Sequence, residues 1–407
     1  MNYDNNIRTL YKSIWSENCD VRISESWLMI LISDVEPIKI LSIMEKNVVN
    51  NDNQFIVKGY GASGDLINGK TLKEMDVIRD KPKSDEVLIE VLYCGVCHSD
   101  IHQVNNDWKN TRYPSVPGHE VIGKIIETGS EVSGFEKGQI VGVGCMIDSC
   151  QSCESCKNGE EQFCLGEHGA TMTYNGYFND PESDYNTFGG YSSHIVVNKE
   201  FLLTLPEKLQ LSSAAPILCA GITTYSPLKK AGIKEGSKVA IVGIGGLGHM
   251  AVQIAKAMGA NVTAITTKEE KREEAMKLGA DQVIISEYKK DMEAHELAFD
   301  FILITIPYGF DINLYIPLLG VKGSLVTVGL LGEYDKPLNN MEVSKFGRSV
   351  GGSLIGGIKE TQEVLDFCAE HGIAPEVEMI KIEEINDAFD KIKNEDVRFR
   401  YVIDMAK

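Results

Sequence analysis

The chain has 407 residues, of which 43% are hydrophobic and 24% charged, an ordinary composition for a soluble globular protein of about two domains. Its 40 basic and 59 acidic residues give a net charge of −19, which argues against nucleic-acid binding and against docking on anionic lipid, since both favour a basic surface. Ten cysteines are too few for a disulfide scaffold at this length, so clustered cysteines are expected to bind metal or take part in catalysis.

The first 50 residues differ from the rest of the chain in their sequence pattern. Their apolar run, Trp27–Ile32, has six residues, whereas a membrane span needs about 20. Acidic residues such as Asp4 and Glu17 are atypical of an organellar transit peptide, which is poor in acids. We therefore expect a cytoplasmic protein with no membrane partner, and an N-terminal extension of unknown role over residues 1–54.

Residues 55–200 are expected to be mostly β-structure. Val87–Val96 and Val121–Thr128 alternate or run apolar, as strands do, and their surroundings are rich in glycine and turn residues. Cys97 comes at the end of the first of these strands.

Three metal-ligand residues lie far apart in the sequence. Cys97, His119 and Cys219 could together bind a zinc ion with a fourth position left free. Two thiolates would cancel the 2+ charge and leave an exchangeable Lewis acid that can polarise a carbonyl. Each residue alone is weak support, because Cys219 could be a small buried hydrophobe and His119 could cap a turn. Cys94 and Cys97 could also form a C-x-x-C redox pair.

Four further cysteines form a compact cluster with the spacing C-x2-C-x2-C-x7-C: Cys150, Cys153, Cys156 and Cys164. Four thiolates on one loop can close a tetrahedral shell around zinc, which makes the expected site structural. An iron–sulfur cluster is the alternative, but the bacterial run has a last gap of about three residues followed by proline. Here the gap is seven and Leu165 follows. Unliganded thiols are a further alternative, and on one short loop they would oxidise readily.

After about residue 220 the pattern changes to strands that alternate with helices. Strands are expected at Lys238–Gly243, Asn261–Thr266, Gln282–Ile285, Phe299–Thr305 and Ser324–Gly329, and helices at Leu247–Met258 and Glu269–Leu278. This alternation predicts a parallel sheet built from β-α-β units. From about Gly352 we expect a helical stretch at Lys359–Glu370 and two short β-like segments.

A glycine-rich segment, Gly243–Gly248, fits G-x-G-x-x-G and lies between an expected strand and an expected helix, which is the context that indicates dinucleotide binding. Gly243 would make the tight turn, Gly245 would admit the pyrophosphate, and Gly248 would let helix and strand approach. Gly246 and Leu247 lie in the same loop and are expected to contact the cofactor. The alternative is a plain tight turn.

The end of the next strand indicates which cofactor binds. An NAD site usually has Asp or Glu there, to bind the ribose 2′-hydroxyl. This chain has hydroxyl and basic side chains instead: Thr266, Thr267, Lys268, Lys271 and Arg272. They suit a 2′-phosphate, so we expect NADP(H). The nearby carboxylates of Glu269 and Glu270 leave NAD as an alternative cofactor. Lys271 and Arg272 could instead form a solvated helix face, paired with Glu273 and Glu274.

Eight motifs extend these patterns: KGYGA, CGVCHSDIH, PGHEVIG, the four-cysteine loop, GGYSSHIVV, LCAGITTYSPL, GIGGLGH and KETQEVLDFCAEH. On them the chain resembles the zinc-containing medium-chain alcohol dehydrogenases, and within them the cinnamyl-alcohol-dehydrogenase-like branch of NADP-dependent aldehyde reductases. The resemblance covers about residues 55–407. It implies an α/β protein with a GroES-like β-rich catalytic domain in two pieces, 55–219 and 353–407, and a Rossmann doubly wound parallel-sheet domain over 220–352.

The resemblance also implies roles at the zinc sites. Cys97, His119 and Cys219 would bind catalytic zinc, while Cys150, Cys153, Cys156 and Cys164 would bind structural zinc, giving two ions per chain. Glu120 would be a nearby carboxylate or transient ligand. Asp100 would orient a zinc ligand, or else only cap a turn.

Around the substrate the resemblance implies a proton relay. Ser99 would pass a proton to the alkoxide, and His102 would connect Ser99 to bulk water. His98 would lie near the cofactor phosphates. Trp108 would line the substrate pocket, or serve packing alone.

The expected function is hydride transfer between NADP(H) and primary alcohols or aldehydes, by a homodimer. Two alternatives from other classes stay open. One is a zinc-free NADPH–quinone reductase, which would lack the Cys and His ligands. The other is a metal-thiolate sensor or electron carrier without hydride chemistry.

Overall fold

The structure is a computed structural model that describes residues 53–64, 71–329, 332–394 and 400–405. The predictions for the N-terminal extension lie outside the described residues. Apart from the first residue of strand β1, everything described below lies in one compact unit, residues 55–407. No helix in these described ranges is both long and apolar enough to span a bilayer.

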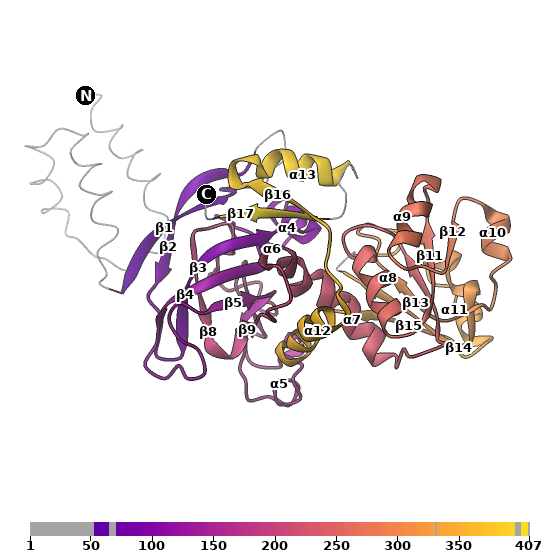
Figure 1. Cartoon of the computed structure of the whole chain (residues 1–407), viewed down its shortest axis with the longest axis horizontal. Helices are drawn as coiled ribbons and strands as arrows, with labels where there is room; N and C mark the ends of the chain where they lie inside the picture. Colours follow the sequence, from indigo (N-terminus) through magenta and orange to yellow (C-terminus); the bar gives the residue numbers. More distant parts are fainter. Residues whose placement is uncertain (1–52, 65–70, 330–331, 395–399, 406–407) are drawn as a thin grey trace, which may run out of the picture. The chain divides into compact units, whose positions relative to one another are not determined.

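The first sheet has seven strands in the order β16-β17-β3-β4-β5-β9, with β8 paired to β3. Their bounds are β3 Glu86–Gly95, β4 Val121–Thr128, β5 Ile140–Val143, β8 His194–Asn198, β9 Leu203–Thr204, β16 Val377–Lys381 and β17 Arg400–Asp404. Strand β17 comes from the end of the chain and pairs antiparallel with β3, with Ile403 opposite Cys94 (Figure 1). The C-terminal segment therefore completes a sheet that begins more than 300 residues earlier.

Short strands and helices surround this sheet. Strands β1 (Gln54–Gly61) and β2 (Lys73–Asp80) form one pair, and β6 (Met146–Asp148) and β7 (Thr171–Met172) form another. The helices are α4 His98–Val104, α5 Glu154–Lys157, α6 Leu211–Ala214 and α13 Ile385–Lys393. One hydrophobic cluster joins these elements, and its largest fully buried members include Tyr191 and Tyr401.

The second sheet has six parallel strands in the order β12-β11-β10-β13-β14-β15. Their bounds are β10 Lys238–Val242, β11 Asn261–Thr266, β12 Gln282–Ile285, β13 Phe299–Ile304, β14 Leu319–Val328 and β15 Ser349–Ser353. Numbered along the chain this order is 3-2-1-4-5-6, the arrangement of the Rossmann fold. The order reverses between β10 and β13, where a ligand crevice is expected at the carboxyl ends of the strands.

Helices cover both faces of the second sheet, and the apolar strand residues divide between two clusters. The helices are α7 Ala220–Lys230, α8 Gly248–Ala257, α9 Arg272–Lys277, α10 Lys289–Glu293, α11 Asn340–Ser344 and α12 Ile358–His371. Helix α8 contacts β10 and β11, whereas α7 contacts β14 and β15 and also packs against α8 and α12 (Figure 1). The predicted α/β class, with a β-rich part and a Rossmann sheet, is confirmed.

The predicted strands are largely confirmed, and the differences have physical reasons. Strand β3 ends at Gly95, so Cys97 is not at a strand end but is the N-cap of α4. The helix predicted over 269–278 begins as a 3-10 turn at Glu269–Lys271, and α9 follows.

Strand β15 and helix α13 are among the elements that were not predicted from the sequence. Strand β15 is glycine-rich and mostly exposed, so it lacks an apolar pattern. Helix α13 buries four residues at helical spacing, Ile385, Ala388, Phe389 and Ile392. That spacing was a readable signal for a helix.

Shortening a buried side chain on β3 should destabilise the part of the fold built on the seven-stranded sheet. Ile89 is fully buried on this central strand. We expect Ile89→Ala to lower the free energy of unfolding by about 2–5 kcal/mol, because the change leaves a cavity. Urea unfolding followed by intrinsic fluorescence would measure it. Ile78→Ala, at a side chain that is 41% exposed on β2, is the matched control and should cost much less. Equal losses for both variants would contradict this assignment of the core.

Candidate active site

Four metal-ligand side chains meet in one buried cluster. One ligand atom from each of Cys97, His119, Glu120 and Cys219 lies within 4.8 Å of all the others. The two sulfurs are 4.0 Å apart, and Nε2 of His119 is 3.2 Å from Sγ of Cys219. Two thiolates on one tetrahedral zinc ion would be about 3.8 Å apart, given Zn–S bonds of about 2.3 Å. The observed spacing and the N/S donor set fit a zinc ion.

The charges in this cluster also fit a cation. Hydrogen bonds from Cys219 and His119, together with the positive charge of nearby Arg400, hold the pKa of Cys97 well below its ordinary value against the effect of burial. The pKa of Cys219 is raised well above its ordinary value by Cys145, Cys97 and burial. Cys97 therefore loses its proton more readily than an ordinary thiol, while Cys219 keeps its proton. A divalent cation would stabilise both as thiolates.

Local sequence places each ligand. Cys97 precedes the first turn of α4, and His119 and Glu120 come directly before β4. Cys219 lies at the junction of a 3-10 turn and α7. A β-carbon at Gly95 would overlap Oε2 of Glu120, so glycine leaves the room that this carboxylate occupies.

Asp100 organises the cluster through four hydrogen bonds. Its Oδ2 accepts from the Cys97 amide at 2.9 Å and from the Tyr191 hydroxyl at 3.0 Å. Its Oδ1 accepts from the Gly118 amide at 3.1 Å and from Nδ1 of His119 at 3.0 Å. Asp100 thus caps α4 and also fixes the His119 tautomer whose Nε2 lone pair faces the thiols. Although burial lowers the pKa of His119, Asp100 and Cys145 raise it well above its ordinary value.

Two residues of this site were not identified from the sequence. The buried guanidinium of Arg400 forms an ion pair with Oε1 of Glu120, while Oε2 of Glu120 has no hydrogen-bond partner in the described part of the chain. Cys145 packs against Cys97 and Cys219. Neither residue stands in a recognisable metal-ligand spacing, so only folding brings them here.

The Cys94–Cys97 redox pair finds no support in the geometry. The Cys97 thiol contacts Cys219, whereas Cys94 Sγ lies 3.6 Å from the Gly95 carbonyl. Burial raises the pKa of Cys94 well above its ordinary value.

The second thiol cluster consists of Cys150, Cys153, Cys156 and Cys164, whose ligand atoms also lie within 4.8 Å of one another. The Sγ atoms of Cys150 and Cys156 are 3.9 Å apart. Backbone amides donate to these sulfurs, from Cys153 to Cys150 at 3.4 Å and from Leu165 to Cys153 at 3.3 Å. Amide donors lower the pKa of Cys150 to about 6, while burial raises that of Cys156 to about 12. Four sulfurs fit a closed zinc shell with no position left for substrate.

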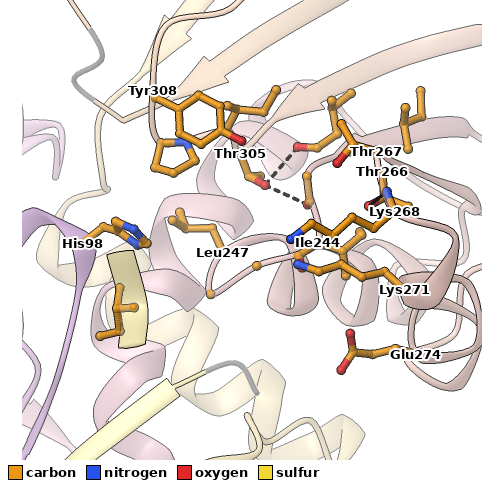
Figure 2. A pocket seen from close by; sticks show the side chains of 18 of the residues that line it. His98, Ile244, Leu247, Thr266, Thr267, Lys268, Lys271, Glu274, Thr305 and Tyr308 are labelled. Carbon is orange, nitrogen blue, oxygen red and sulfur yellow. Dashed lines mark hydrogen bonds between the residues drawn. The ribbon is translucent and has the colours of Figure 1, made fainter. Parts of the chain in front are cut away.

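A pocket runs from the first cluster to the Rossmann strands (Figure 2). It is lined by Cys97 at one end, and by eight of the nine predicted cofactor residues: His98, Gly243, Gly245, Gly246, Leu247, Thr266, Thr267 and Lys271. The ninth, Gly248, begins α8 outside the lining, and a β-carbon there would overlap the carbonyl oxygen of Gly243. Gly245 has open space where a β-carbon would lie, as close approach of a pyrophosphate requires. Thr305 holds the turn with hydrogen bonds of 3.0 Å to the carbonyls of Val242 and Gly243.

The neighbouring basic residues Lys271 and Arg272 differ in position: Lys271 lines the far end of the pocket, whereas Arg272 does not line it. Nζ of Lys271 donates to the carbonyl of Ile244 at 2.8 Å and lies beside the glycine loop, as does Lys268 (Figure 2). Arg272 instead bonds Glu269 and the Val283 carbonyl and does not line the pocket, so of the two residues Lys271 is the better placed for a 2′-phosphate. The guanidinium of Arg272 forms an ion pair with Glu269, three residues earlier.

The proposed relay residues lie along α4. Ser99 and His102 are three residues apart and therefore share a helix face. Nδ1 of His102 donates to Asp107 at 2.8 Å, a partner that was not predicted from the sequence. Trp108 lies with its ring 5.6 Å from that of His102.

Comparisons with known proteins agree with this geometry. Residues 83–207 match the alcohol dehydrogenase GroES-like domain, and residues 246–370 match the zinc-binding dehydrogenase family. Aldehyde reductase YahK of Escherichia coli is 47% identical over 335 residues, 82% of this chain and 94% of that protein. NADP-dependent alcohol dehydrogenase C 1 of Mycolicibacterium smegmatis is 45% identical over 326 residues, 79% of this chain and 90% of that protein.

Solved structures show the same relationship. The cinnamyl alcohol dehydrogenase SbCAD4 of Sorghum bicolor has a TM-score of 0.81 at 37% identity, covering 86% of this chain and 98% of that one. The CAD of Helicobacter pylori, solved with NADP(H), has a TM-score of 0.79 at 39% identity, covering 87% and 99%.

Removing one sulfur of the four-cysteine loop should cost stability more than chemistry. We expect Cys153→Ser to reduce bound zinc from two ions to one per chain and to lower the apparent Tm by about 5 °C or more, because metal binding stabilises this loop. Metal analysis and thermal unfolding would measure both. Glu154→Gln, at the next and exposed residue, is the control and should keep both ions. Two retained ions in Cys153→Ser would contradict the assignment.

Proposed function

The chain belongs to the zinc-containing alcohol dehydrogenase family, and on that basis we propose that it interconverts aldehydes and primary alcohols with NADP(H). One observation carries the proposal. A single pocket extends from Cys97, in the metal-ligand cluster, to Thr266 and Lys271 at the end of β11. It can therefore hold a dinucleotide whose reactive end reaches the metal cluster.

A zinc ion held by Cys97, His119 and Cys219 supplies a Lewis acid that polarises a carbonyl oxygen, and NADPH supplies the hydride. The chain positions both. The glycine turn and the N-terminus of α8 receive the pyrophosphate. The name of the Mycolicibacterium relative includes NADP, and the Helicobacter CAD structure holds NADP(H). Hydroxyl and ammonium groups at Thr267 and Lys271 suit the 2′-phosphate that distinguishes this cofactor.

Ser99 and His102 would move the proton. The Ser99 hydroxyl donates to the product oxygen, and His102, whose Nδ1 is held by Asp107, restores that proton from water. The side chain of His102 is 28% exposed, which is enough for exchange with solvent.

Glu120 and Arg400 form a buried pair beside the metal cluster. Arg400 also lines the cofactor pocket, so one residue contacts both Glu120 and the space for the dinucleotide. We propose that Arg400 would help to hold a cofactor phosphate, and that its weakened ion pair would let the Glu120 carboxylate move toward the metal ligands. Glu120 would then act as a transient ligand.

Further features of the proposal concern domains, assembly and location. We propose a catalytic domain of residues 55–219 and 353–407 around a cofactor domain of residues 220–352, preceded by the extension 1–54. Strand β15 forms an exposed end of the six-stranded sheet and could pair with a second copy, giving a homodimer. We place the enzyme in the cytoplasm.

The direct test follows NADPH oxidation at 340 nm with benzaldehyde and cinnamaldehyde, with NADH in parallel. We expect turnover with NADPH and much less with NADH. Turnover with NADH alone would overturn the interpretation of Thr266 and Lys271 while leaving the zinc chemistry in place. Protein that holds two zinc ions but turns over no aldehyde with either cofactor would overturn the proposed reaction.

Removing a metal ligand should separate chemistry from cofactor binding. We expect Cys219→Ser to lower turnover by about 10³-fold or more, since the Lewis acid supplies several kcal/mol, while the dissociation constant for NADPH changes little. Cofactor fluorescence would measure binding. Cys368→Ser replaces a buried thiol on α12, outside the site, and is the matched control that should keep turnover. Near-normal rates in Cys219→Ser would refute the assigned metal ligand.

Neutralising one cation should raise the KM for NADPH. We expect Lys271→Gln to raise it by about tenfold, because the 2′-phosphate loses an ionic partner, and to leave the KM for NADH unchanged. Arg272→Gln is the control, since Arg272 bonds Glu269 instead of facing the pocket. Steady-state kinetics with both cofactors would decide, and equal effects of the two substitutions would contradict the assignment.

A further inference from the structure

Tyr191 lies outside the metal-ligand cluster, yet two separate sets of contacts connect it to His119. Its side chain is fully buried, and its hydroxyl donates to Oδ2 of Asp100 at 3.0 Å. Oδ1 of the same carboxylate accepts from Nδ1 of His119 at 3.0 Å. The hydroxyl is therefore one hydrogen bond away from the group that orients a metal ligand.

The second set of contacts runs through the backbone. The amide of Tyr191 donates to the carbonyl of Pro117 at 3.0 Å, and the amide of Gly190 donates to that of Gly118 at 2.8 Å. Gly118 has φ of 103°. A β-carbon on it would lie 2.7 Å from Cδ1 of Tyr191, so the tyrosine ring packs directly on the backbone that precedes His119.

The loop that carries Tyr191 is held from its other side by Arg79. Nη2 of Arg79 donates to the carbonyls of Phe188 and Gly189 at 2.9 and 3.2 Å, and to Oγ of Ser192 at 2.7 Å. Burial lowers the pKa of Arg79 to about 9, and no carboxylate pairs with it in the described part of the chain. Arg79 is partly buried, and withdrawing a guanidinium from water is costly, so its use on these backbone carbonyls indicates that the loop is held firmly.

We propose that Tyr191 is a positioning residue for the catalytic metal: its hydroxyl and ring hold Asp100 and the Gly118 turn so that Nε2 of His119 faces Cys97 and Cys219. Asp100 is fully buried and accepts four hydrogen bonds. Without the hydroxyl, Oδ2 loses the hydrogen bond that holds it beside the Cys97 amide, and the carboxylate can rotate away from the His119 ring. Outer partners of this kind typically change metal affinity by about 10- to 100-fold.

The test measures metal retention, and it rests on the metal site of the proposed function. Tyr191→Phe removes the hydroxyl and keeps the ring that packs on Gly118. The zinc-loaded full-length chain is exposed to excess EDTA, and the zinc that remains per chain is measured over time. We expect Tyr191→Phe to lose one zinc ion about tenfold faster than the unaltered chain. The ion in the four-cysteine loop should leave at an unchanged rate, so each chain contains its own control.

Two further variants separate positioning from a general loss of stability. Tyr113→Phe removes another tyrosine hydroxyl of the same part of the fold, one that donates to the Val104 carbonyl at 2.9 Å, and it should leave both zinc ions unaffected. Asp100→Asn should accelerate loss of the catalytic ion by itself. Adding Tyr191→Phe to it should have no further effect, because the hydroxyl acts through that carboxylate.

The other outcomes overturn the proposal in distinguishable ways. Unchanged retention of both ions in Tyr191→Phe shows that the hydroxyl does not position the metal. Faster loss of both ions, with a lowered Tm, shows a general structural role. Additive effects in the double variant show that Tyr191 does not act through Asp100. An unaltered chain that binds zinc only in the four-cysteine loop would overturn the catalytic metal site itself, and with it both proposals.

Discussion

Bringing two thiols, an imidazole and a carboxylate within 4.8 Å of one another inside the protein is the constraint on which the rest of the site depends. Without a cation this arrangement is unfavourable, because buried thiolates repel each other and lose their hydration. The surrounding chain provides fixed partners for the remaining groups. Asp100 holds His119, and Arg400 neutralises Glu120. A zinc ion held by the two sulfurs and Nε2 of His119 would satisfy all three donors together.

The fold delivers these groups from four distant parts of the chain. Cys97 and His119 flank the β3–β4 pair, Cys219 begins the helix that leads into the Rossmann sheet, and Arg400 begins the last strand of the seven-stranded sheet. Since β17 pairs with β3, the C-terminal strand carries a cation to the metal site and to the cofactor pocket at once. The pairing of β17 with β3 therefore completes the seven-stranded sheet and also brings Arg400 to the site.

Glycines in this protein mark places where other groups need the space. A β-carbon would overlap the Glu120 carboxylate at Gly95, the Tyr191 ring at Gly118 and the Gly243 carbonyl at Gly248. In each case a side chain or a helix must come closer to the backbone than any other residue would permit. The missing side chain at Gly118 is what lets the Tyr191 ring pack on the turn before His119 and so contact the backbone beside the metal cluster.

The sequence by itself determined the features that short stretches of chain encode. The four-cysteine loop, the glycine-rich turn after β10 and the alternation of strands with helices were predicted, since their ligands, turns and periodicities lie within a few residues. Helix α13 also carried a local signal, which the sequence analysis missed. Resemblance to a known family, and not spacing, joined Cys97 and His119 to Cys219. Only the tertiary structure decided that Arg400 meets Glu120 and that Tyr191 reaches Asp100. Those contacts depend on strand register and loop packing across tens to hundreds of residues, for which no local pattern exists.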